Sequence, residues 1–201
     1  MLDNSVRRAI DPALLGLGRW LSDRGVSPNG MTVAAFAVGM LAALGIASGS
    51  TWIGLVLLLL SRLGDGLDGW IARASGRQSD LGGYLDIVLD FVFYGAIPLA
   101  FALLDPSANA VPACVLLLTF YANGASFLAY AMMVEKRGGA DRGPKSFLYT
   151  TGLAEGTETI AVFVAMCLFP GAFAWIAYGF AIVVAYTTFS RIMLACLAFR
   201  D

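Results

Sequence analysis

The sequence SRLGDGLDGWIAR at residues 61–73 is followed closely by LGGYLDIVLD at residues 81–90, and the two stretches set four aspartates in apolar surroundings. The four are Asp65, Asp68, Asp86 and Asp90. The first two are three residues apart and the last two are four residues apart. On an α-helix both spacings put the two side chains on one face. The sequence therefore predicts two helices that each present a pair of carboxylates.

The short polar connection at residues 74–80 makes these two helices antiparallel neighbours, so all four aspartates are expected near the same membrane surface. Four carboxylates that meet repel one another unless a cation neutralises them. The chain has no His, and no Cys lies nearby, so the oxygen ligands suit Mg²⁺ or Mn²⁺. We expect two ions, because two-metal sites bind phosphates and stabilise both oxygens of a displacement.

The composition excludes several classes of protein. Of the 201 residues 59% are hydrophobic and only 13% are charged, which is unlike a water-soluble globule. The lack of His excludes Ser-His-Asp hydrolases and HExxH zinc enzymes. A net charge of −1 gives no sign of nucleic-acid binding. The three cysteines lie in apolar runs without CxxC spacing, so we expect neither a disulfide framework nor a zinc site, only ordinary packing.

Six apolar stretches are long enough to cross a bilayer, whose hydrocarbon core of about 30 Å requires about 20 residues. They are approximately residues 30–48, 52–74, 82–104, 111–134, 147–169 and 172–197. Residues 3–25 combine apolar side chains at helical spacing with four arginines, which indicates an interfacial helix or a short helix facing water. We predict an all-α integral membrane protein in which six transmembrane helices follow an N-terminal amphipathic interfacial helix. The prediction is a single domain over residues 1–201, with the interfacial helix at 1–28 and the six-helix bundle at 29–201.

Basic residues lie on one side of this predicted topology. The connections near residues 49–51, 105–110 and 170–171 contain no Lys or Arg. The opposite side receives Arg7, Arg8, Arg19, Arg24, Arg73, Arg77, Lys136, Arg137, Arg142, Lys145 and Arg200. Because positive residues flank the cytoplasmic face, both termini and the aspartates are expected there.

Glycines are frequent around the aspartates. They are Gly64, Gly66, Gly69, Gly82 and Gly83. A missing side chain lets a bulky anion approach the backbone, but it also lets two membrane helices pack closely. The sequence leaves both interpretations open.

The pattern Asp65-x-x-Asp68-Gly69-x-x-Ala72-Arg73, then eight residues, then Gly82-x-x-x-Asp86-x-x-x-Asp90, resembles the signature of the CDP-alcohol phosphotransferase (phosphatidyltransferase) family at every position. The chain is most similar to small bacterial members of unassigned acceptor, which share a stretch like Lys145-Ser146-Phe147 followed by Gly156-Thr157-Glu158-Thr159. The resemblance implies transfer of a phosphatidyl group from CDP-diacylglycerol to an alcohol with release of CMP, in phospholipid biosynthesis. It also implies a homodimer in the bacterial inner membrane.

The resemblance assigns a role to each residue of the signature. Asp65, Asp68 and Asp86 are implied as metal ligands, and Asp90 as both a metal ligand and the general base for the acceptor hydroxyl. The CDP-binding residues that it implies are Asn29, Thr32, Asp65, Asp68, Gly69, Ala72, Arg73 and Gly82. For two of these an alternative is a plain helix start, with Asn29 as the cap and Thr32 in the first turn.

The acceptor site is expected from basic residues in the second half of the chain. Arg142, Lys145 and Arg191 are the candidates for binding the phosphate of a polyol phosphate, such as glycerol 3-phosphate or, as second choice, inositol phosphate. The alternative for the first two is a positive flank that orients a helix. Phosphatidylinositol-phosphate synthases of the family carry an arginine where this chain has Thr151-Gly152-Leu153. Nearby, Glu155 and Glu158 are expected either to pair with Arg62 or Arg191 or to line the acceptor cavity.

Two other classes of protein remain as alternatives. An intramembrane prenyltransferase also binds a diphosphate through aspartates and Mg²⁺, but its aspartate pairs are expected on well-separated helices. A cation-coupled transporter could bind an ion at an acidic cluster, but such folds usually contain internal repeats, and the sequence has none.

Overall fold

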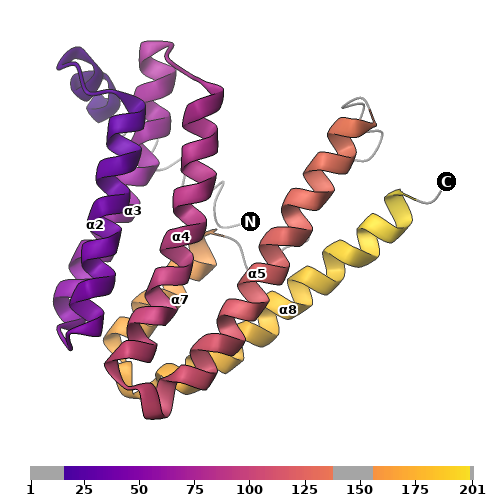
Figure 1. Ribbon diagram of the computed structural model, residues 1–201. Helices are drawn as coiled ribbons and strands as arrows, with labels where there is room; N and C mark the ends of the chain where they lie inside the picture. The colour runs from indigo at the N-terminus through magenta and orange to yellow at the C-terminus, as the bar shows by residue number, and fades with distance from the viewer. Residues whose placement is uncertain (1–15, 138–155, 200–201) are drawn as a thin grey trace. The chain divides into compact units, whose positions relative to one another are not determined.

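The computed structural model describes residues 16–137 and 156–199, and every regular element in these ranges is a helix (Figure 1). The elements are α2 (Pro28–Ala47), α3 (Thr51–Ser75), α4 (Asp80–Leu104), α5 (Pro106–Lys136), α7 (Gly156–Leu168), the short 3₁₀ helix η1 (Pro170–Ala172) and α8 (Phe173–Ala198). The all-α prediction is thus confirmed. The chain divides into two compact units, residues 1–104 and 105–201.

In the first unit α2 lies against both α3 and α4. Ser27 caps α2 by accepting a hydrogen bond from the Gly30 amide at 3.1 Å. Small residues bring the helices close: a Cβ atom at Gly54 of α3 would lie 2.5 Å from Ile46 of α2. Likewise, a Cβ at Gly64 would lie 3.0 Å from the Cβ of Ala35. The close approach fixes the register of α3 on α2, as in other membrane bundles with small residues at the interface.

In the second unit α5 lies beside α8, and α7 contacts α8. The Phe120 ring of α5 meets Phe163 of α7 and Phe180 of α8 edge-on, with ring centres 6.2 and 6.0 Å apart. The carboxylate of Asp105 begins α5 by accepting hydrogen bonds from the Ser107 hydroxyl at 2.7 Å and the Ala108 amide at 3.2 Å. These bonds favour the ionised form, so they hold the pKa of Asp105 below its usual range.

Within residues 16–137 and 156–199, four helices are long and apolar enough to cross a membrane: α2, α4, α5 and the stretch Pro170–Ala198 that contains α8. Large apolar side chains are exposed on them, including Trp175 (81% exposed) and Ile182 (72%). Lipid explains this exposure better than water does. The described residues therefore support an integral membrane protein, but the predicted number of six transmembrane helices is not confirmed.

The two remaining candidate spans differ from the others. The helix α3 has 25 residues but carries Arg62, Asp65 and Asp68, while the described part of α7 has 13 residues. The first nine residues of the predicted fifth span, 147–155, lie outside the described residues. Elsewhere the predicted boundaries agree with the helices to within five residues, the largest difference being at the start of α5.

The predicted interfacial helix falls only partly on described residues. Residues 1–15 lie outside them, and residues 16–23 are helical. This short helix contacts α3, because a Cβ at Gly18 would lie 3.1 Å from the Cβ of Trp70. The interfacial position itself stays a prediction.

Candidate metal and nucleotide site

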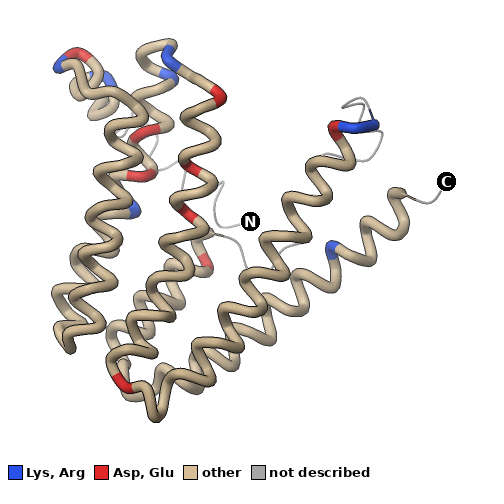
Figure 2. The backbone as a smooth tube through the Cα atoms, in the orientation of Figure 1, with Lys and Arg blue, Asp and Glu red and all other residues tan. Residues whose placement is uncertain are grey.

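Three of the four aspartates come together between α3 and α4. One carboxylate oxygen from each of Asp65, Asp68 and Asp86 lies within 4.8 Å of the others. Figure 2 shows acidic positions on these neighbouring helices of the first unit. The antiparallel hairpin predicted from the short connection is therefore confirmed.

The geometry of this cluster fits a small divalent cation. Mg²⁺ binds oxygen at about 2.0–2.1 Å, so two oxygens on opposite sides of one ion lie about 4.2 Å apart. The observed limit of 4.8 Å is only slightly larger. All three side chains are partly buried and offer hard carboxylate oxygens, which suit Mg²⁺ or Mn²⁺.

The fourth aspartate lies outside this group and pairs with an arginine. Asp90 Oδ1 accepts a hydrogen bond from Arg62 Nη1 at 2.7 Å, and the same nitrogen lies 3.3 Å from Asp65 Oδ2. The expectation that all four carboxylates meet is thus fulfilled for three of them. The physical reason is that a cation of the protein itself already holds Asp90.

A buried set of side chains holds Arg62 in place. Its guanidinium carbon lies 3.9 Å from the centre of the Phe93 ring, and Nη2 donates to the Ser61 hydroxyl at 3.2 Å. The Ser61 hydroxyl in turn donates to the Ala35 carbonyl of α2 at 2.8 Å. Close by, a Cβ at Gly39 would lie 2.7 Å from the Phe93 ring and 2.8 Å from Ser61 Oγ. Helices α2, α3 and α4 all contribute to this set.

Sequence reasoning missed Arg62 as a member of the site. A signal was available, because Arg62 and Asp65 stand three residues apart on one helix and an intramembrane arginine needs a partner.

Thr32 of α2 is joined directly to the acidic cluster. Its hydroxyl donates to Asp68 Oδ2 at 2.5 Å and lies 3.1 Å from the Pro28 carbonyl oxygen. The alternative role of Asn29 as helix cap is wrong, because Ser27 caps α2 and Asn29 stands inside the first turn. The Asn29 side chain instead faces α4, since its Oδ1 atom would lie 3.0 Å from a Cβ at Gly82.

A pocket of about 240 Å³ opens beside the cluster, entirely within the first unit. Its lining consists of Pro28, Asn29, Thr32, Asp68, Gly69, Ala72, Arg77, Gln78, Ser79, Gly82, Gly83 and Asp86. Six of the eight residues implied for CDP binding belong to this lining, and Asp65 and Arg73 do not. The connection between α3 and α4 adds Arg77, Gln78 and Ser79, which sequence reasoning did not single out.

Two helices begin at this pocket. Pro28 and Asn29 are the first residues of α2, and Gly82 and Gly83 lie in the first turn of α4, where the Gly82 amide donates to Ser79 Oγ at 3.1 Å. The N-terminus of an α-helix carries a partial positive charge of about 0.5 and attracts anions. The pocket therefore combines two positive helix ends with a carboxylate cluster suited to cations, an arrangement that fits a metal-bound phosphate group.

The glycines occupy different surroundings. Gly69, Gly82 and Gly83 line the pocket, so the approach of an anion stays a prediction there, whereas Gly64 packs against Ala35 as a helix contact. A Cβ at Gly66 or Gly83 would meet nothing within 4 Å.

The Arg73 guanidinium folds back along its own helix. It lies 4.2 Å from the centre of the Trp70 ring, and its Nη1 atom would lie 3.3 Å from a Cβ at Gly69. Arg73 thus contacts the backbone that forms one wall of the pocket.

The acceptor-site candidates are only partly described. Arg142 and Lys145 lie outside the described residues. Arg191 belongs to the second unit, where its Nη1 atom donates to Asn123 Oδ1 at 2.9 Å across the α5–α8 contact. Within the described part, Oε2 of Glu158 is buried and has no hydrogen-bond partner.

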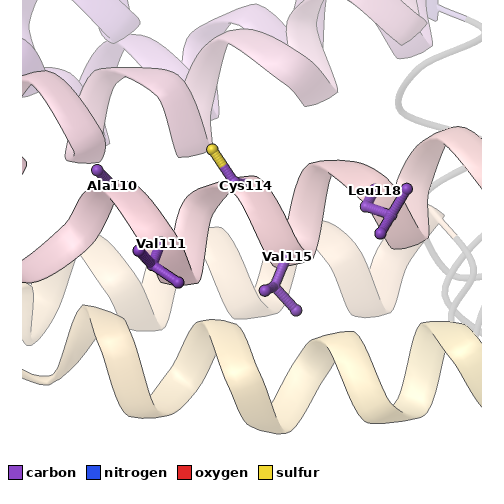
Figure 3. A pocket seen from close by; sticks show the side chains of 5 residues that line it. All are labelled: Ala110, Val111, Cys114, Val115 and Leu118. Atoms are coloured by element: carbon purple, nitrogen blue, oxygen red, sulfur yellow. The ribbon is translucent and has the colours of Figure 1, made fainter.

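A second pocket, of about 280 Å³, is lined by one helix (Figure 3). Its residues are Ala110, Val111, Cys114, Val115 and Leu118 of α5. None of them carries a carboxylate or a basic group, so this pocket offers neither a hard oxygen ligand for Mg²⁺ or Mn²⁺ nor a cation for a diphosphate.

Apolar helices, a cluster of hard oxygen ligands and an adjoining anion-binding pocket fit a membrane-embedded enzyme that acts on a phosphate ester. The sequence matches the CDP-alcohol phosphatidyltransferase family over residues 25–199, and the chain belongs to this family. It is therefore a transferase that moves a phosphatidyl group from CDP-diacylglycerol to an alcohol. Family membership confirms the resemblance and sets aside the prenyltransferase and the transporter.

Among curated proteins, the chain is similar over its whole length to the inner membrane protein YnjF of Escherichia coli K12, at 44% identity over 100% of this chain and 98% of that protein. It is also 30% identical to an archaetidylinositol phosphate synthase of Pyrococcus horikoshii, over 43% of this chain and 46% of that enzyme.

Among solved structures, a phosphatidylinositol phosphate synthase of Mycobacterium tuberculosis shares the fold. The form with CDP-diacylglycerol bound gives a TM-score of 0.72 at 19% identity and covers 90% of this chain and 92% of that one. The form with manganese and citrate gives a TM-score of 0.70 at 19% identity, over 94% of this chain and 92% of that one.

Proposed function

We propose that the pocket between α2, α3 and α4 binds the cytidine diphosphate end of CDP-diacylglycerol and that Asp65, Asp68 and Asp86 hold divalent cations beside it. The observation that carries this proposal is the position of the three-carboxylate cluster at the edge of a pocket where two helices begin. Two ions, Mg²⁺ or Mn²⁺, when bound, neutralise the diphosphate and stabilise the leaving phosphate. Support for the metal also comes from the related fold solved with manganese.

Residues of the protein bind the nucleotide and accept the proton of the acceptor. Asn29, Thr32 and the glycine-lined floor at Gly69 and Gly82 shape the nucleotide pocket, and the Arg73 guanidinium lies beside Gly69. Asp90 accepts the proton of the acceptor hydroxyl. The acceptor oxygen then bonds to the phosphorus that carries diacylglycerol, and the bond from that phosphorus to the CMP oxygen breaks.

We infer that the acceptor is a polyol phosphate. The supporting residues are Arg142, Lys145 and Arg191, which supply cations for its phosphate. Glycerol 3-phosphate is the first expectation, but the relatives include an archaetidylinositol phosphate synthase and a phosphatidylinositol phosphate synthase. The chain's full-length relative carries a name that states no acceptor, so an inositol phosphate stands beside glycerol 3-phosphate as a candidate.

The proposed setting is a bacterial inner membrane, as the name of the E. coli relative suggests. The distribution of Lys and Arg supports termini and an active site that face the cytoplasm. We also propose a homodimer, as the family resemblance implies.

The test is turnover by the purified full chain in detergent. The assay supplies CDP-diacylglycerol, Mn²⁺ or Mg²⁺ and a panel of acceptors, and it measures CMP release and the lipid product. The panel contains glycerol 3-phosphate, inositol phosphate, unphosphorylated polyols and phosphatidylglycerol. We expect product only with a phosphorylated polyol, and Asp90→Asn should abolish turnover while CDP binding remains. Normal turnover by Asp90→Asn would contradict the assignment of the base.

A further inference from the structure

We propose that Arg62 is a positioning residue of this site: its guanidinium holds Asp90 apart from the cluster of Asp65, Asp68 and Asp86 and competes with divalent cations for the Asp65 carboxylate. This inference rests on the proposed function for the role of Asp90. The competition for the Asp65 carboxylate, however, is a property of the protein without any lipid.

The first support is the sharing of one nitrogen between two helices. Arg62 Nη1 lies 2.7 Å from Asp90 Oδ1 on α4 and 3.3 Å from Asp65 Oδ2 on its own helix α3. A charge-assisted bond as short as 2.7 Å fixes the direction of a carboxylate more firmly than a neutral bond does. Asp90 is accordingly absent from the described group of oxygens that can share a cation.

The second support is how tightly the arginine is held. The Arg62 side chain is only 8% exposed, stacks on the Phe93 ring and donates to Ser61. In the described part of the chain its buried Nε has no hydrogen-bond partner. Buried donors are usually hydrogen-bonded, so a purely structural arginine would be expected to use its Nε as well. The guanidinium instead contacts the two carboxylates and leaves Nε without an acceptor.

The third support is charge. Four ionised aspartates and Arg62 together carry −3, from four negative charges and one positive charge. A divalent cation that binds Asp65 meets the positive guanidinium next to the same carboxylate, and like charges at this range repel. Removal of the guanidinium charge should therefore tighten metal binding, even as it releases Asp90 from its position.

The experiment compares Arg62→Gln and Arg62→Lys with the wild type and with Arg24→Gln as a matched control. Arg24 is exposed and stacks on Trp20, with its guanidinium carbon 3.4 Å from the ring centre, in the same unit. Two quantities are measured on the full chain in detergent. One is the dissociation constant of Mn²⁺, followed by the electron paramagnetic resonance signal of the unbound ion without lipid. The other is kcat and KM for CMP release.

For Arg62→Gln we expect a Mn²⁺ dissociation constant lowered about three- to tenfold, because a neighbouring positive charge is gone. We also expect kcat to fall about tenfold or more with KM for CDP-diacylglycerol changed less than about threefold, since Asp90 and not the donor pocket is disturbed. Arg62→Lys keeps the charge, so its Mn²⁺ affinity should stay near wild type. Its kcat should still fall, because an ammonium group cannot reproduce the planar contacts to two carboxylates and a ring. Arg24→Gln should change neither quantity.

Weaker Mn²⁺ binding in Arg62→Gln together with lower kcat would overturn the proposal and leave Arg62 as a purely structural residue. Unchanged kcat in both variants would overturn it as well. If Arg62→Gln does not fold, Arg62→Lys decides by the same criterion: its kcat must fall while Mn²⁺ affinity holds. Failure of the wild type to release CMP would instead contradict the proposed function, and the Mn²⁺ comparison would still show whether Arg62 competes with the metal.

Discussion

Replacement of Gly82 by alanine should separate stability from nucleotide binding. A Cβ at this position would lie 3.0 Å from Asn29 Oδ1 and 3.3 Å from Ser79 Oγ. Both atoms are the ends of polar side chains at the pocket, so a shift of a few tenths of an ångström relieves the contact. In a helix alanine is favoured over glycine by about 0.5–1 kcal/mol. The free energy of unfolding should therefore stay unchanged or rise by up to about 1 kcal/mol.

Binding should change in the opposite direction. The added methyl group enters the pocket of about 240 Å³ and displaces the Asn29 amide from its position. The loss of one hydrogen bond to the nucleotide, about 0.5–1.5 kcal/mol, corresponds to a rise in KM for CDP-diacylglycerol of roughly two- to tenfold. The assay is CMP release at varied CDP-diacylglycerol, together with thermal unfolding in the same detergent.

Gly66→Ala is the matched control for Gly82→Ala. Gly66 is exposed on α3, and a Cβ there would meet nothing within 4 Å. It receives the same methyl group and the same gain in helix propensity, so stability should rise while KM stays at the wild-type value. An unchanged KM in Gly82→Ala would refute the placement of the nucleotide in this pocket. A large loss of stability in Gly82→Ala would refute the reasoning about the flexible neighbours.

Three further outcomes test other contacts. Gly39→Ala should destabilise the protein by about 1–2 kcal/mol in thermal unfolding, because a Cβ 2.7 Å from the buried Phe93 ring costs more than the helix gains; a higher melting temperature would contradict this. Thr32→Val should lower kcat/KM about tenfold and Thr32→Ser should restore most of it, because the hydroxyl donates to Asp68 Oδ2 at 2.5 Å; equal activity of the two variants would argue against a role for this bond. Mn²⁺ at 100 times its dissociation constant should raise the free energy of unfolding by about 2.7 kcal/mol, and EDTA should reverse the increase. The same increase in Asp68→Asn would show that Asp68 is not a metal ligand.

The spacing of the aspartates predicted much of the site before any coordinates were considered. Asp65 and Asp68 had to share a helix face, and the short connection had to bring Asp86 beside them, because helix geometry and chain length leave no other arrangement. Helix ends were also predictable to within a few residues, since apolar runs of this length have one low-energy form in a bilayer. Asn29 shows the limit at finer scale, because Ser27 takes the capping role that the sequence analysis considered for Asn29.

The amino-acid sequence alone determined the class of fold, the family and the acidic cluster, because these depend on local helix periodicity and on residues close together in the chain. The tertiary structure alone decided that Arg62 holds Asp90, that Thr32 donates to Asp68, and that Gly39 makes room for the Phe93 ring. These contacts join different helices, α3 with α4 for Arg62 and α2 with its neighbours for Thr32 and Gly39, and the rotation and close packing of the helices decide which side chains meet. No spacing within a single helix encodes that rotation.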